Sequence, residues 1–253
     1  MFRNLSWKLK EHSELIKYGY KHNLLYDIFL RKYRERAFKY WQEYPLKQVL
    51  SKGFRFSNNT PIGALREIFC EGIYEVRGFI PGRGQWVIDV GANYGDAAIW
   101  WAKTYGSKVI AFEPLVNVYR ELNENVKLND ADVIAYNVAV GNGEEIKGVN
   151  DIHMFTLGGD TKIKTVKLDE YSFDRVDLLK IDVEGFEVEV LQGAKETITK
   201  YHPKIIIETH SKSLRKACHE LLSSLGYSLR MEGRTIVSKN PRMDRVTNLF
   251  YSI

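Results

Sequence analysis

The chain has 253 residues and a formal net charge of +5, with 44% hydrophobic and 27% charged residues. These values fit a soluble globular protein with one large domain and a small appendage, and no window approaches the about 18 consecutive apolar residues of a membrane span. The N-terminus lacks the apolar core of a secretory signal, and Cys70 and Cys218 are isolated thiols without metal-ligand spacing, so we expect a cytoplasmic protein.

Residues 1–60 form a basic first segment. They hold 13 Lys and Arg against 5 Asp and Glu, a net charge of +8, whereas residues 61–253 sum to −3. Apolar and aromatic side chains repeat every three or four residues, which predicts two or three helices over 13–52. This helical extension could hold an anionic partner such as RNA, a phosphorylated glycan or an anionic membrane surface, although a solvated face packed on the main domain explains it equally well.

Residues 54–85 form a turn-rich segment with a short helix near 62–69. An apolar strand over 86–90 and a helix over 95–105 follow. In the loop between them, Gly91 and Gly95 carry no side chain that would keep a ligand away from the backbone. Asp89 places a negative charge at the strand end, where open α/β sheets bind ligands. The pattern Asp-x-Gly-x-x-x-Gly suits a ligand with an ammonium or sulfonium group better than a pyrophosphate, unless the loop is only a tight connection.

The next apolar strand, over 108–113, ends in Glu113, 24 residues after Asp89. An acid at that distance is placed to accept both ribose hydroxyls of a nucleoside, and its charge would repel a 2′-phosphate. Pro114 ends the strand because it cannot donate a ladder hydrogen bond. Two acids and two glycines in this order predict a site for a nucleoside that also bears a positive group, and S-adenosylmethionine is the expected cofactor.

The remaining chain alternates between helices and strands. The expected elements are a helix over 115–128, a strand over 132–138, an extended, hairpin-like section over 144–168, a strand over 177–182, a helix over 186–200, a strand over 204–209, a helix over 212–225, a strand over 227–231, and a closing pair near 234–238 and 246–252. This alternation predicts an α/β fold with a doubly wound, mostly parallel sheet. We therefore divide the chain into the extension, 1–60, and a cofactor-binding domain, 61–253.

Polar residues gather where the predicted strands end, on one edge of the sheet. A buried carboxylate without a partner is costly, so acids at these positions predict a cationic ligand. The expected cofactor-binding residues are Asp89, Gly91, Asn93, Tyr94, Gly95, Glu113, Pro114, Ala139, Val140 and Asp182. The Tyr94 ring could face a sulfonium, whereas Trp100 and Trp101 lie one turn into a helix and are expected in the core.

A hydroxyl acceptor would need a group that takes its proton. We expect Asp182, Glu184 and His210 to be catalytic, with Glu187 a further candidate. Lys180 is a weaker candidate that points along the strand or pairs with an acid. Asp182, Glu208 and His210 could instead hold a divalent metal that polarises the hydroxyl. Since these two acids can equally orient substrate and His210 can begin the next helix, we expect no metal ion.

Several motifs together resemble the FkbM family of class I S-adenosylmethionine-dependent methyltransferases. They comprise Asp89–Asn93 with Glu113-Pro114, Asn125 and Asn129, Asn137–Gly141, Leu179–Glu187, Leu191–Ala194 and Pro203–Glu208. The resemblance covers roughly residues 70 to 210, and Ile181–Glu187 is its most specific part. It implies a seven-stranded Rossmann-like sheet with one antiparallel strand. It also implies O-methylation of a sugar, glycolipid or secondary metabolite. Metal-dependent O-methyltransferases of this fold place acids at the same two strand ends as Asp182 and Glu208.

Three other functions are open. RNA methylation would use the basic segment 1–60, although the chain lacks the Asn-Pro-Pro-aromatic or Asp-Pro-Pro-aromatic element expected of enzymes that methylate base amino groups. A nicotinamide-dependent oxidoreductase would need a Gly-x-Gly-x-x-Gly turn, which the first crossover lacks. A binding module without activity is disfavoured by the complete set of acids at the strand ends.

Overall fold

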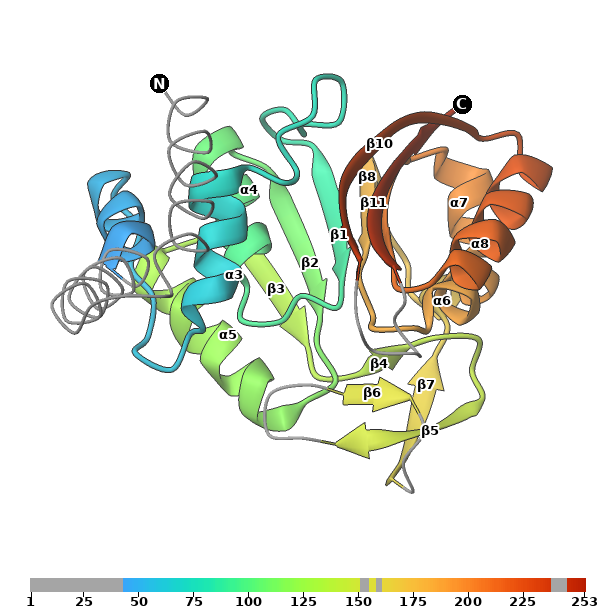
Figure 1. Cartoon of the computed structure of the whole chain (residues 1–253), viewed down its shortest axis with the longest axis horizontal. Coiled ribbons are helices and arrows are strands. Elements are labelled where there is room, and N and C mark those ends of the chain that lie inside the picture. The colour runs from blue at the N-terminus through green and yellow to red at the C-terminus, as the bar shows by residue number, and fades with distance from the viewer. Residues whose placement is uncertain (1–42, 151–154, 158–160, 238–244) are drawn as a thin grey trace, which may run out of the picture. The chain divides into compact units, whose positions relative to one another are not determined.

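The computed structural model describes residues 43–150, 155–157, 161–237 and 245–253 (Figure 1). Its contacts divide the chain into Met1–Lys47 and Gln48–Ile253. Of the first unit only 43–47 are described, and they are helical. The predicted helices of 13–52 therefore lie largely outside the described residues, and both the extension 1–60 and its anionic partner stay predictions.

The second unit is built on a seven-stranded sheet with the order β10-β11-β9-β8-β1-β2-β3. Only β11 runs antiparallel to the rest, which confirms the doubly wound, mostly parallel sheet. Apart from Asp89 and Lys180, the residues of the central strands β1 and β8 are apolar, and all except Trp86 are buried, as expected where helices cover both faces. The strands are β1 (Trp86–Val90), β2 (Lys108–Phe112), β3 (Val133–Tyr136), β8 (Leu178–Ile181), β9 (Lys204–Thr209), β10 (Ser228–Val237) and β11 (Arg245–Ser252).

Helices cover the two faces of this sheet (Figure 1). One face carries α3 (Ile62–Arg66), η1 (Glu67–Glu71), α4 (Asp96–Tyr105) and α5 (Val116–Asn129), and the other carries η2 (Leu168–Glu170), α6 (Glu187–Gly193), α7 (Lys195–Tyr201) and α8 (Lys212–Ser224). Each face has its own core, with Trp101 in the first and Leu191 and Cys218 in the second. Because β1, β2, β8 and β9 are parallel, their carboxyl ends lie at one edge of the sheet.

A smaller sheet lies beyond the carboxyl ends of the central strands (Figure 1). Its order is β4-β7-β5-β6, from β4 (Ala139–Val140), β5 (Glu145–Asn150), β6 (Phe155–Leu157) and β7 (Thr161–Val166). The predicted hairpin-like section 144–168 therefore contains three strands, and its β7 pairs with β4 next to the main sheet. This arrangement brings the insertion to the edge where the sequence places its polar residues.

Three predicted elements differ from the structure. The strands expected at 227–231 and 234–238 form one strand, β10, whose register is irregular between Leu229 and Met231 and between Glu232 and Thr235. The helix expected over 186–200 breaks at Ala194, next to Gly193, which packs so closely that an added Cβ would lie 1.8 Å from the carbonyl oxygen of Gly141. The helix near 62–69 continues as the π-helical turn η1 and ends at 71.

Both cysteines are free thiols, with Cys218 buried and Cys70 half-buried. Within the described ranges, no helix combines the length and the apolar character that a membrane crossing requires.

Candidate active site

A cavity of about 200 Å³ opens where β1, β2, β4 and β8 end. Aliphatic and aromatic side chains form most of its wall, and three carboxylates, those of Glu113, Asp182 and Glu184, also line it. Its lining residues are Val90, Gly91, Asn93, Phe112, Glu113, Pro114, Leu115, Val138, Ala139, Val140, Ile163, Asp182, Val183, Glu184 and Phe186. Seven of the ten predicted cofactor-binding residues are in this set; Asp89, Tyr94 and Gly95 are not.

The floor of the cavity depends on the close approach of two strand ends at Gly91. Gly91 has φ +77°, and an added Cβ would lie 1.8 Å from the carbonyl oxygen of Asp182. Its amide donates to Phe112 O at 3.0 Å, and the amide of Asp182 donates to Val90 O at 3.0 Å. A glycine is therefore required here both for the backbone conformation and for the space.

Gly91→Ala should cost clearly more stability than the same change at Gly84. Gly84 has φ +73° but nothing within 4 Å of an added Cβ, so Gly84→Ala measures the backbone term alone, about 1–2 kcal/mol. Gly91→Ala must also displace the Asp182 carbonyl. Urea unfolding of both variants measures the difference, and equal losses would show that the two strand ends can separate freely.

Glu113 is buried at the end of β2, and both of its oxygens are held by backbone amides. Oε2 accepts from Asn93 N at 3.0 Å and Oε1 from Leu115 N at 2.9 Å. Asn93 adopts φ +51° in making this contact. Burial outweighs these two hydrogen bonds and raises the pKa of Glu113 to about 7. Asn137, at the end of β3, donates its side-chain amide to the Glu113 and Pro114 carbonyls and fixes this turn.

Asp89 does not face the cavity, contrary to its predicted role. It is fully buried and forms an ion pair with Lys180, whose Nζ lies 3.0 Å from Oδ1 and also donates to Gly91 O at 2.7 Å. Burial lowers the pKa of Lys180, but the charges of Asp89 and Asp182 outweigh it and raise the pKa above its ordinary value. The cation that Asp89 requires is therefore a residue of the chain itself.

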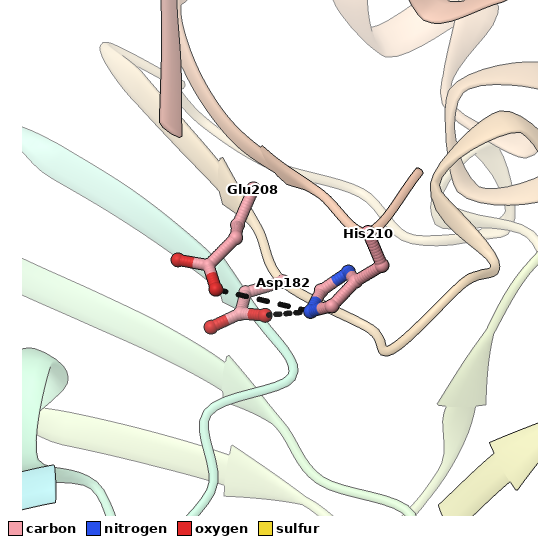
Figure 2. A group of neighbouring side chains, drawn as sticks. All are labelled: Asp182, Glu208 and His210. Atoms are coloured by element: carbon pink, nitrogen blue, oxygen red, sulfur yellow. Dashed lines mark ion pairs between the residues drawn. The ribbon is translucent and has the colours of Figure 1, made fainter. Parts of the chain in front are cut away.

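A second group of polar side chains extends from the cavity along the ends of β8 and β9. Figure 2 shows Asp182, Glu208 and His210 pointing toward one another. His210 Nε2 lies 3.4 Å from Glu184 Oε2, 3.7 Å from Asp182 Oδ1 and 3.8 Å from Glu208 Oε1. Its Nδ1 lies 2.7 Å from Oε1 of the buried Glu187, which also accepts from Gly185 N. The structure thus brings all the predicted catalytic residues together.

The carboxylates of this group favour the protonated, positively charged form of His210. Burial lowers the pKa of His210, but the hydrogen bond to Glu187 and the surrounding carboxylates outweigh it and raise the pKa well above its ordinary value. Burial and the charge of Asp182 raise the pKa of Glu208, and burial raises the pKa of Glu184 to about 7. Asp182 and Glu184 are about a quarter to a third exposed, at 26% and 33%, so both are accessible from the cavity.

Tyr94 and Gly95 are the two loop residues that the structure keeps out of the cavity. The Tyr94 side chain is buried against Leu115, Val118 and Phe186. Gly95 has φ +79° and begins α4. Both residues therefore support the loop without lining the cavity. The Tyr94 ring is not placed to face a bound cation. Trp100 and Trp101 are in the core, as expected.

Most of the apolar wall was not predicted from the sequence, and Glu187, a further catalytic candidate, was not predicted to hold His210. Phe112, Val138 and Ile163 come from three separate segments, and their residue types are those of ordinary strand interiors. Glu187 is the first residue of α6, a position where acids are common on exposed helix ends. Only its position, two residues after the Asp-Val-Glu-Gly motif, marks it.

The chain is similar to proteins described as methyltransferases. The model of the family described as "Methyltransferase FkbM domain" matches residues 89–229. The chain is 28% identical over 211 residues to methyltransferase sdnD of Sordaria araneosa, covering 65% of this chain and 81% of that protein. It is 30% identical over 146 residues to the hexuronic acid methyltransferase AglP of Haloferax volcanii, covering 53% of this chain and 60% of that protein. The FkbM methyltransferase structure from Methylobacillus flagellatus KT aligns with a TM-score of 0.47 and 16% identity, over 85% of this chain and 59% of that chain.

Proposed function

The chain belongs to the FkbM methyltransferase family, and we propose that it transfers the methyl group of S-adenosylmethionine to a hydroxyl oxygen of a sugar, glycolipid or secondary metabolite. The main support for this proposal is a single cavity. One part of it has apolar walls and the buried acid Glu113, and the other part has two accessible carboxylates, Asp182 and Glu184. The first part suits an adenosine, and the second suits a positive sulfur and a hydroxyl that must lose a proton.

The adenosine half would rest on the apolar wall and on Glu113. The Phe112 and Phe186 side chains belong to that wall and can cover an adenine ring. Each Glu113 oxygen accepts one backbone hydrogen bond and keeps a lone pair for a ribose hydroxyl. Gly91 presents bare backbone on the same side.

Glu184 is the residue best placed to take the proton of an acceptor. It lines the cavity, its Oε2 makes no hydrogen bond within the described residues, and its backbone adopts φ +54°. A left-handed conformation at a non-glycine residue is costly and is concentrated at functional sites. In the proposed step the acceptor oxygen forms a bond to the methyl carbon, the sulfur–methyl bond breaks, and Glu184 receives the hydroxyl proton.

Cofactor affinity should rise with pH as Glu113 ionises. Its pKa of about 7 means that Glu113 is a neutral acid below that pH and a carboxylate above it; Lys180 favours the carboxylate and Asp89 opposes it. A carboxylate accepts ribose hydrogen bonds more strongly, so binding should tighten from about pH 6 to about pH 8. Glu113→Gln should weaken binding about 10- to 100-fold at the higher pH and flatten the profile, as calorimetry can measure. An unchanged profile in this variant would place the ribose elsewhere.

The acceptor class is supported by a relative, AglP, whose name describes a hexuronic acid methyltransferase. The test is transfer of labelled methyl from the cofactor to three separate fractions: glycans and glycolipids, small hydroxylated metabolites, and RNA. We expect label that resists mild alkali, as an ether does, in one of the first two. Label only in RNA would favour the alternative based on the basic segment 1–60, and label in none would contradict the proposal.

A further inference from the structure

We propose that Asp182, Glu208 and His210 form a binding site for a divalent first-row metal ion. This inference revises the expectation of no metal that the sequence suggested. The binding itself is independent of the proposed reaction. A role for the ion in polarising the acceptor hydroxyl rests on that reaction.

Donor atoms of the three side chains converge on one point. One ligand atom from each of Asp182, Glu208 and His210 lies within 4.8 Å of the other two (Figure 2). Ligand atoms at about 2.0–2.2 Å from a metal lie roughly 3.0–3.5 Å from their neighbours in the shell. The observed separations from His210 Nε2, 3.7 and 3.8 Å, reach that range through side-chain shifts of a few tenths of an ångström.

Glu187 fixes the orientation of the His210 ring. Glu187 is fully buried and lies 2.7 Å from Nδ1, which fixes the ring and turns Nε2 toward Asp182 and Glu208. A carboxylate on the far nitrogen is the usual partner of a metal-binding histidine. Glu187 also accepts from Gly185 N, so its own position is fixed by the backbone.

Nε2 lies 3.4–3.8 Å from three carboxylate oxygens and makes no closer contact with a polar atom in the described part of the chain, although the His210 side chain is only 2% exposed. Its nearest carboxylate oxygen, Glu184 Oε2, is 3.4 Å away, beyond the about 2.7–3.2 Å of an N–H···O bond. Oxygens spaced around the nitrogen without a direct bond suit a shared ion between them.

The neighbouring strand β11 carries a buried polar oxygen without a hydrogen-bond partner. Asn248 of β11 is directly opposite Glu208 of β9, and directly paired residues share one face of a sheet. Asn248 is 3% exposed, and its Oδ1 has no hydrogen-bond partner. A buried polar oxygen without a partner needs an explanation, and an ion held by Glu208, or water bound to that ion, would supply one.

The donor set indicates which ions fit. Two carboxylates suit Mg²⁺ and Mn²⁺, whereas an imidazole nitrogen suits Zn²⁺ and other first-row transition ions. Their combination favours Mn²⁺ or Zn²⁺ over Mg²⁺ or Ca²⁺. Asp182 and Glu184 also line the cavity, so an ion here would border the acceptor.

The test uses the full chain after treatment with a chelator, with Mn²⁺ alone as the probe and Zn²⁺ as a second arm. Paramagnetic resonance counts bound Mn²⁺, calorimetry measures both ions, and neither readout needs cofactor or methyl transfer. We expect one equivalent per chain. Glu187→Gln, which removes no ligand, should weaken binding about 10- to 100-fold, and Glu208→Gln and His210→Gln should weaken it at least as much.

Two variants on α8 serve as matched controls. Glu220 is exposed and pairs with Lys216, and His219 is bonded to the Tyr251 hydroxyl. Glu220→Gln and His219→Gln should bind as the wild type does, and circular dichroism verifies that every variant is folded. If Mn²⁺ and Zn²⁺ do not bind, or bind with equal affinity to Glu208→Gln and Glu220→Gln, the proposal is overturned and His210 is an imidazolium held by its carboxylates. A chain that binds metal but transfers no methyl group would contradict only the proposed function.

Discussion

Replacing Lys180 by methionine should lower the free energy of unfolding by about 3–5 kcal/mol, because it leaves Asp89 buried without its cation. The Lys180 side chain is 5% exposed and that of Asp89 is fully buried. Methionine keeps most of the side-chain length, so the packing of β8 against β1 changes little. Urea unfolding near neutral pH measures the loss.

A second change separates the ion pair from packing. Asp89→Asn combined with Lys180→Met removes both charges and should recover most of the stability, since a neutral pair costs less to bury than one unpaired charge. Lys204, exposed at the start of β9, is the matched control, and Lys204→Met should stay within about 0.5 kcal/mol of the wild type. A double variant that is no more stable than Lys180→Met would contradict this explanation.

Glu184→Gln should reduce the rate of methyl transfer by about 10²- to 10⁴-fold with little change in cofactor affinity, because a positioned base contributes that much. Glutamine matches glutamate in shape but cannot take the acceptor proton. Single-turnover transfer measures the rate, and calorimetry with the demethylated cofactor measures affinity.

Two comparisons make this result specific. Glu196→Gln changes an exposed acid on α7 outside the cavity and should leave the rate unchanged. Asp182→Asn changes the other accessible carboxylate and should also slow transfer. Full activity in both Glu184→Gln and Asp182→Asn would show that the active site lies elsewhere.

The strand–loop–helix unit around Gly91 could be predicted because its signals are local. An apolar run ending in an acid, followed by glycines, requires the same turn wherever it occurs, and the parallel sheet then brings Glu113 and Asp182 to the same edge. The predicted group of Asp182, Glu184 and His210 is close together for this reason. Its members follow neighbouring strands, β8 and β9.

Long-range packing explains what the sequence did not reveal. Pairing of Lys180 with an acid was one expectation, but the sequence did not identify the acid as Asp89, which is on the next strand of the sheet but 91 positions away in the chain. Tyr94 is in a loop, yet residues from α5 and from the segment before α6 bury it. Neither partnership leaves a local pattern, because each depends on which elements are neighbours in the folded sheet.

The central claim is that the cavity at the ends of β1, β2, β4 and β8 holds S-adenosylmethionine. Equilibrium dialysis of the folded chain with radiolabelled cofactor tests it most directly. We predict one equivalent of saturable label per chain, displaced by the demethylated product and strongly weakened in Glu113→Gln but not in Glu196→Gln. Absence of saturable binding, or equal binding by these two variants, would contradict it.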